Sequence, residues 1–204
     1  MSLLNKLKLV AGLKTEEKQS QLENNHYDIQ KEDKNDVIFA KNLIKNNGNF
    51  FYCDKQDELI KTIQGLNAKL NLNSIYCIEP ILQDLLNKSA IIYNKYEHSK
   101  CDAILSSCEY LIAQQGKVML SSKQIGPNNI KNLPQTHIII AYTSQIVKSL
   151  NEGMSGLNRR YIDNLPSTIT TIKSQTNNEQ KSIEGNIKEL SVVLIEDYRD
   201  SKSI

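Results

Sequence analysis

Residues 132–147, NLPQTHIIIAYTSQIV, contain the clearest buried strand of this 204-residue chain and decide its fold class. The stretch His137–Tyr142 (HIIIAY) is apolar at nearly every position, which predicts a strand covered on both faces, as in a parallel sheet. Thr143 or Ser144 follows this strand and is expected to cap a helix that runs to Leu150. A buried strand followed directly by a helix is the unit from which α/β folds are built.

The same alternation of strands and helices is predicted on the N-terminal side of this stretch. Strands are expected at residues 50–53, 74–78 and 90–93. A helix capped by Asp36 is expected to end at Gly48 in the left-handed conformation, and further helices are expected to begin at Asp54 and Pro80. Short connections between these segments favour a parallel sheet with helices on its faces.

Residues 109–120 interrupt the alternation with two β-prone stretches, Glu109–Gln114 and Lys117–Leu120, which meet at Gln115-Gly116. Glycine supplies the positive φ that a tight hairpin needs. Two more strands are expected at 167–172 and 190–195. We therefore predict an α/β fold with a central, mainly parallel sheet, flanking helices and a β-hairpin insert.

The chain is expected to divide into an N-terminal tail, residues 1–35, and one α/β domain, residues 36–204. Residues 1–14 place leucines and a valine on one helical face, and the stretch up to Asp36 is polar, acidic and without period. The tail is therefore predicted to be an amphipathic helix followed by a flexible acidic linker. The helix could bind a membrane or partner surface, or it could simply be a frayed or packed terminal helix.

The composition excludes several classes of protein. The formal net charge is +2, which provides no field for nucleic-acid binding. No apolar run approaches the roughly 20 residues of a transmembrane helix, and no secretory signal follows Met1. The four cysteines have no closely paired spacing, which favours free structural thiols in a reducing, cytoplasmic location.

The search for catalytic and cofactor motifs gives little. The glycine-rich phosphate-binding motifs are absent, and three scattered histidines do not suggest a metal site, so we predict neither a metal nor a cofactor. Glu109 is a weak candidate for a catalytic base or nucleophile, because it enters the hairpin where α/β folds commonly place ligands. The alternative is an ordinary glutamate that faces solvent at the start of a strand.

A small anionic ligand is expected, if a pocket exists, between the hairpin turn, the loop after the hairpin and the loop after strand 168–172. Hydroxyl groups and backbone N–H groups at such loops are suitable donors for an anion. The candidate ligand-binding residues are Gln115, Gly116, Ser121, Ser122, Lys123, Ser144, Ser174 and Thr176.

Three segments together resemble the LUD-domain family, typified by lactate utilization protein C. They are CDAILSSCEYLIAQQGKVMLSS at 101–122, NLPQTHIIIAYTSQIV at 132–147 and LSVVLIED at 190–197. The matching positions are Gly116 at the turn, followed by Leu133, Pro134, His137, Ile146 and Val147. From about Phe50 to Asp197, the resemblance implies a fold like that of the sugar-phosphate isomerase and CoA-transferase superfamily. It also implies a role in L-lactate oxidation beside iron–sulfur oxidoreductase subunits.

The chain departs from this family where polar site motifs are expected. Gln115 and Lys117 replace the threonines that usually flank the turn glycine, and Asn178 stands where the family has an acid. No His-Gly-Pro follows Gly185-Asn186. These departures indicate a divergent member with an altered or lost site. Three functions remain open: an accessory subunit of a redox assembly, a non-catalytic interaction or regulatory module tethered by its N-terminal helix, and an isomerase- or transferase-type enzyme using Glu109.

Overall fold

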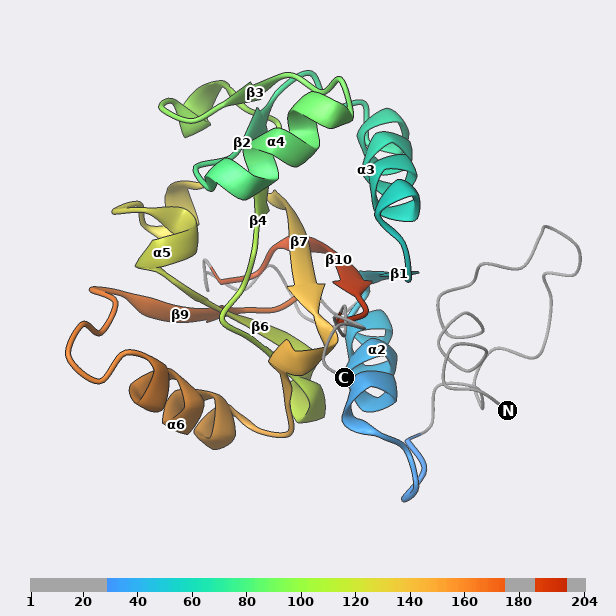
Figure 1. Cartoon of the computed structure of the whole chain (residues 1–204), viewed down its shortest axis with the longest axis vertical. Coiled ribbons are helices and arrows are strands. Elements are labelled where there is room, and N and C mark those ends of the chain that lie inside the picture. The colour runs from blue at the N-terminus through green and yellow to red at the C-terminus, as the bar shows by residue number, and fades with distance from the viewer. Residues whose placement is uncertain (1–28, 175–185, 198–204) are drawn as a thin grey trace, which may run out of the picture.

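The computed structural model describes residues 29–174 and 186–197, which form two β-sheets with helices packed around them (Figure 1). The larger sheet has six strands in the order β1-β10-β7-β4-β2-β3, and every neighbouring pair is parallel. Its strands are β1 (Asn49–Cys53), β2 (Ile75–Tyr76), β3 (Tyr93–Asn94), β4 (Ala103–Ser106), β7 (Thr136–Tyr142) and β10 (Glu189–Ile195). The predicted parallel α/β sheet is therefore confirmed.

The predicted hairpin belongs to a separate, four-stranded sheet with the order β8-β5-β6-β9. This sheet contains β5 (Tyr110–Ile112), β6 (Lys117–Ser121), β8 (Ile146–Val147) and β9 (Ile169–Ile172). Strands β5 and β6 are antiparallel and connected through the short helix η2 (Ala113–Gln115) and Gly116. Gly116 has φ +59°, as the turn prediction required.

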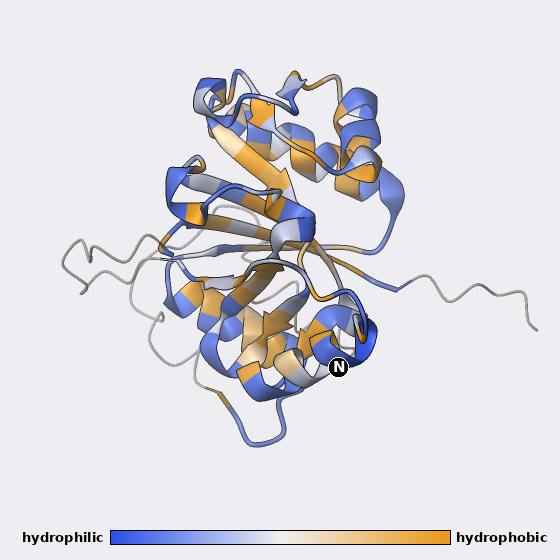
Figure 2. Cartoon of the chain, turned by 90° about the vertical axis from the view of Figure 1, so that its left-hand side faces the viewer, coloured by the Kyte–Doolittle hydropathy of each residue, from blue (hydrophilic) through white to orange (hydrophobic). Residues whose placement is uncertain are grey.

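The helices cover the sheets in layers. Helix α2 (Asn35–Lys45) packs on the face of the large sheet that also meets the small sheet, and α3 (Gln56–Lys69) and α4 (Pro80–Lys88) pack on the opposite face. Helix α6 (Leu150–Arg160) covers the outer face of the small sheet, where Leu157 is fully buried. Apolar residues line the inner surfaces and polar residues the outer surfaces of these layers (Figure 2).

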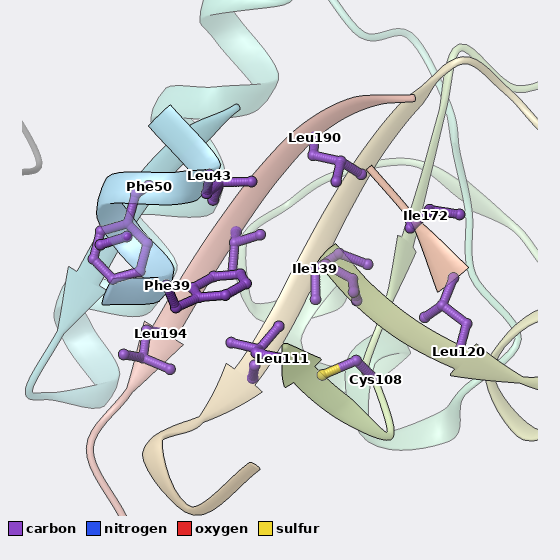
Figure 3. Packing of buried hydrophobic residues seen from close by; sticks show 14 of the residues in the cluster. Phe39, Leu43, Phe50, Cys108, Leu111, Leu120, Ile139, Ile172, Leu190 and Leu194 are labelled. Carbon is purple, nitrogen blue, oxygen red and sulfur yellow. The ribbon is translucent and has the colours of Figure 1, made fainter. Parts of the chain in front are cut away.

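The core between the two sheets is made of aliphatic and aromatic side chains from both. Phe39 of α2 and Phe50 of β1 pack edge to face with ring centroids 6.4 Å apart. Leu111 of the small sheet and Ile139 of the large sheet point into the same cluster (Figure 3). This shared core holds the second sheet against the first.

The predicted helix from Thr143 to Leu150 is wrong. Thr143–Gln145 form one turn of 3-10 helix, η4, and Ile146 and Val147 then pair with β5 as strand β8. These two β-branched residues extend the small sheet beside Leu111 and Ile112. Helix α6 begins only at Leu150, and the Ser149 hydroxyl accepts a hydrogen bond from the Glu152 N–H at 3.4 Å.

Several predicted helix ends also need correction. Asp36 lies inside α2 and Asp54 precedes α3, because Lys34 and Lys55 occupy the N-cap positions. Asn47, with φ +60°, takes the left-handed conformation expected of Gly48. Gly48 instead permits a close approach, since a Cβ there would lie 2.4 Å from the Leu43 side chain. Pro80 does open α4 as predicted.

Four strands are shorter than predicted, β5 and β9 among them, and one strand was missed. Residues 74–78 contribute only Ile75–Tyr76, and the strand expected at 90–93 is Tyr93–Asn94. The central strand Ala103–Ser106 was not predicted. The predicted N-terminal helix and most of the linker lie outside the described residues, and none of the helices described is long and apolar enough to cross a membrane.

Candidate functional site

Polar side chains gather just beyond the carboxyl ends of strands β2 and β4. Glu79 follows β2 and occupies the N-cap position of α4, directly before Pro80. Strand β4 leads through Ser107 and Cys108 to Glu109, which enters β5. Folds with parallel sheets usually bind ligands at this edge. We therefore take the surroundings of Glu79 and Glu109 as the candidate site.

Glu109 is buried, with 1% of its surface exposed, so the interpretation of it as a solvent-facing glutamate is wrong. Its Oε1 accepts hydrogen bonds from the Ser121 hydroxyl at 2.7 Å and from the Gln124 amide at 3.1 Å. Its Oε2 accepts from the Arg160 guanidinium at 3.0 Å, and the Tyr161 hydroxyl lies 3.3 Å from both oxygens. Side chains from β6, α5 (Ser122–Ile125) and the end of α6 therefore converge on one carboxylate.

Arg160 and Tyr161 bring cationic and aromatic groups to the solvent side of this cluster. The Arg160 guanidinium lies 4.9 Å from the centroid of the Tyr110 ring and donates to its hydroxyl at 3.2 Å. The Lys123 ammonium lies 5.3 Å from the centroid of the Tyr161 ring. Partial burial, together with the nearby Glu109 carboxylate, raises the pKa of the Tyr161 phenol. The cluster thus has a buried anion and an exposed cationic edge.

Glu79 forms a second carboxylate contact beside this cluster. Its Oε1 accepts from the Ser107 N–H at 2.7 Å, and its Oε2 accepts from the Ser107 hydroxyl at 2.5 Å. Burial raises the pKa of Glu79, although the bonds from Ser107 act in the opposite direction. Glu79 is half-buried, so it is more accessible to a ligand than Glu109.

His137 is fully buried, and one of its two ring nitrogens, Nδ1, has no hydrogen-bond partner among the described residues. Its Nε2 lies 2.8 Å from the Ser106 hydroxyl, and burial lowers its pKa to about 3, so the imidazole is neutral. Lys188, which adds to this effect on the His137 pKa, is itself buried and donates to the backbone oxygens of Leu133 and Pro134 at 2.9 and 3.2 Å. The Leu-Pro-x-x-His segment is thereby fixed at the start of β7.

The predicted ligand-binding residues of the hairpin lie at opposite ends of β6. Gln115 and Gly116 form the turn, which α2 covers: the side chains of Asn42 and Asn46 donate to the backbone oxygens of Ala113 and Gln115. The other end of β6 carries the remaining hairpin candidates, Ser121, Ser122 and Lys123. Ser121 belongs to the Glu109 cluster and caps α5, while Lys123 is exposed beside Tyr161.

The other candidates lie apart from the Glu109 cluster or outside the described residues. Ser144 does not begin a long helix; its N–H and hydroxyl donate to the Asp197 carboxylate at 2.7 and 2.9 Å. Ser174 is 1% exposed, and its hydroxyl oxygen accepts from the Leu190 N–H. Thr176 and Asn178 fall in the range that the structure does not describe. A ligand-binding role for these residues stays a prediction.

Four residues of the candidate site were not identified from the sequence: Glu79, Gln124, Arg160 and Tyr161. A local signal existed for Gln124, because Ser121 and Gln124 form the Ser-x-x-Gln capping box at the start of α5. The others had no such pattern, since Arg160 and Tyr161 lie about fifty residues from Glu109 in the chain.

Comparison with known proteins identifies one family. The family model described as the LUD domain matches residues 38–195. A crystal structure of a DUF162 family protein from Deinococcus radiodurans superposes with a TM-score of 0.59 and 16% sequence identity, covering 79% of this chain and 96% of that chain. At this identity the superposition supports the fold alone. A search of curated proteins found no match.

Proposed function

Since this chain belongs to the LUD-domain family, we propose that it is a non-catalytic accessory subunit that binds a small anion within a redox assembly. The family resemblance points to an assembly that oxidises L-lactate or a related hydroxy acid, with iron–sulfur clusters in partner subunits. The proposal includes a cytoplasmic location and a separate role for residues 1–35 as a tail.

The hydrogen bonds to Glu109 carry the proposal. A carboxylate offers about four acceptor positions, and here Ser121, Gln124, Arg160 and Tyr161 occupy both oxygens. A general base or nucleophile must have a lone pair free to reach the substrate. Glu109 is therefore better suited to holding the small sheet, α5 and α6 together than to transferring a proton or an acyl group.

The cationic edge of the same cluster supports an anionic ligand. Lys123 is exposed, and the Arg160 side chain remains 43% exposed although its guanidinium bonds Glu109. Two positive groups beside the cluster would attract a carboxylate such as lactate or pyruvate. The half-buried Glu79 lies at the same sheet edge and could accept a hydrogen bond from a ligand hydroxyl.

Affinity purification of the tagged full-length chain from its native cells tests the accessory role. We expect iron–sulfur proteins to co-purify, which iron analysis and the visible absorbance of the clusters would detect. Recovery of the chain without any such protein, at mild ionic strength, would refute the assignment to a redox assembly.

Titration of the purified chain with L-lactate and pyruvate, followed by NMR, tests the ligand. Lys123→Gln should weaken binding, whereas Lys131→Gln, at another exposed lysine, should leave it unchanged. Equal behaviour of the two variants would contradict a ligand at the Lys123–Arg160 edge. Turnover of a hydroxy or keto acid that is lost in Glu109→Gln would instead support the enzymatic alternative.

The interaction module remains the second candidate function. The first helix of the described part, α2, begins at Asn35, and the ion pair between Asp33 and Lys41, at 2.7 Å, links the residues before the helix to the helix itself. A deletion of residues 1–28 therefore keeps this pair. Loss of partner binding at unchanged melting temperature would support tethering through the tail, and unaltered binding would exclude it.

A further inference from the structure

A groove of about 330 Å³ opens between α3 and α4, above the carboxyl ends of β7 and β10. Its floor is aliphatic and consists of Leu59, Leu82, Leu85, Ile140 and Ile195. The helices α3 and α4 that flank it lie together on one face of the large sheet (Figure 1). None of the residues of the Glu109 cluster lines it, so it is a separate feature of the molecule.

Two large apolar side chains at the groove are unusually exposed. Ile81, in the first turn of α4, has 82% of its surface exposed, and Tyr142, the last residue of β7, has 43% exposed. Removing such apolar surface from water is favourable in proportion to the area that is covered. An apolar ligand segment that covers Ile81 and Tyr142 would therefore gain binding energy from surface that the fold leaves in water.

The charged side chains at the rim of the groove favour a ligand that carries a negative charge. Lys55, at the N-cap of α3, and Lys88, in the last turn of α4, both line the groove, and neither has an ion-pair partner within residues 29–174 and 186–197. Asp84 is the one carboxylate of the lining, which leaves two ammonium groups against one carboxylate. The rim is therefore net positive, which is unfavourable for the lysine-bearing N-terminal segment at residues 1–14 as an occupant.

We propose that this groove binds a small amphipathic anion, whose aliphatic tail lies between α3 and α4 and whose carboxylate lies between Lys55 and Lys88. At roughly 30 Å³ per heavy atom, the volume of a water molecule in the liquid, the groove holds about eleven heavy atoms. A saturated carboxylate of eight carbons has this size. The inference does not rest on the proposed accessory function, because it uses a different set of residues.

Calorimetric titration of the full chain with octanoate, octanol and acetate tests the proposal. Octanoate should bind, acetate should not, and octanol should bind about tenfold more weakly than octanoate because it lacks the charge that meets the lysines. Binding of octanol and octanoate with equal affinity would overturn the role of Lys55 and Lys88. Absence of octanoate binding at millimolar concentration would overturn the site itself.

A variant inside the groove and a matched variant outside it test where the ligand binds. Ile81→Asp replaces an exposed apolar side chain by a like charge and should weaken octanoate binding about tenfold or more. Ile92→Asp changes an isoleucine that is 72% exposed but outside the groove, and it should have no effect. Because both side chains are exposed, neither change should unfold the domain, and equal affinities in the two variants would refute the location.

The lysine pair is tested in the same way. The double variant Lys55→Gln/Lys88→Gln should bind octanoate about tenfold more weakly and octanol as before. The control Lys61→Gln/Lys69→Gln, on exposed positions of α3, should match the original chain. Sedimentation at several protein concentrations tests whether a second copy of the chain occupies the groove. Self-association that disappears in Ile81→Asp would mean that a second copy fills the groove, and the ligand proposal would then be wrong.

Discussion

Replacement of Glu109 by glutamine tests the idea that this buried carboxylate holds the small sheet and its helices together. The amide keeps the size of the side chain but replaces one acceptor oxygen by an NH2 group. Because glutamine is neutral, the ion pair of 3.0 Å with Arg160 is lost in both orientations of the amide; if the NH2 group faces Ser121 and Gln124, the two bonds that these side chains donate are lost as well. In either orientation at least one buried or half-buried donor has no acceptor.

The expected loss of stability follows from these contacts. A hydrogen bond to a charged group contributes about 1.5–3 kcal/mol, and we reduce this to about 1 kcal/mol because the Arg160 side chain is 43% exposed and screened by water. An unsatisfied donor adds about 1–2 kcal/mol. The sum, about 2–3 kcal/mol, corresponds to a decrease in Tm of about 5–10 °C for a domain of this size.

Thermal unfolding followed by circular dichroism gives the measurement, and Glu97→Gln gives the control. Glu97 pairs with Lys100 at 2.6 Å, which is closer than Glu109 lies to Arg160. Both side chains of the Glu97–Lys100 pair, however, are more than half exposed. We therefore expect no resolvable change in Tm for Glu97→Gln. Equal decreases in Tm for the two variants would show that Glu109 does not hold the small sheet and its helices together. Strictly additive losses of stability for Glu109→Gln and Arg160→Met would show the same.

Three further changes have expected outcomes that unfolding measurements can check. Gly116→Ala should lower the free energy of unfolding by well over 1 kcal/mol, because φ is +59° and the new Cβ would lie 2.7 Å from the Asn42 backbone. Gly65→Ala, in α3 with open space around it, should instead raise the free energy of unfolding by about 0.5–1 kcal/mol. A destabilising effect of Gly65→Ala would contradict this reasoning. Ser121→Ala removes the α5 cap and a bond to Glu109 and should cost about 1–2 kcal/mol, while Ser122→Ala should cost far less, and equal losses would show that Ser121 is not special. The pKa of His137, about 3 in the fold, lies below its ordinary value of 6.5, so the unfolded chain binds more protons between these pH values and stability falls as pH decreases through that window, by at most about 1.4 kcal/mol per pH unit. Urea titrations at pH 7, 6 and 5 should show this slope in the original chain and a smaller slope in His137→Gln; identical slopes would exclude His137 as its source.

The sequence was sufficient for those parts of the fold whose signal is local. Strands β1, β7 and β10 each contain a continuous apolar run, proline is favoured at the first position of a helix, as at Pro80, and Gly116 has a positive φ that few other residues adopt. Ile146 and Val147 were assigned to a helix because two neighbouring apolar residues fit a helical face as well as a strand. Their pairing with β5 depends on residues 35 positions earlier, which no local pattern records.

The candidate site was harder to predict for the same reason. The position of Glu109 at the end of a β4–β5 connection could be inferred, but its burial could not, because Arg160 and Tyr161 come from the far end of α6. Ser121 was identified as a possible ligand-binding hydroxyl, and the structure places it beside Glu109 and in a capping box. Hydroxyl residues near strand ends serve helix caps and ligand sites alike, so residue type alone does not separate the two roles.

The position of β10 has a consequence for the synthesis of the protein on the ribosome. This strand contains residues 189–195, yet it lies between β1 and β7 in the middle of the large sheet. Before residues 189–195 have been synthesised, β1 and β7 each have an unpaired edge and apolar side chains that no neighbouring strand covers. The large sheet can therefore be completed only after residues 189–195 have left the ribosome, and earlier intermediates should depend on chaperones to avoid aggregation.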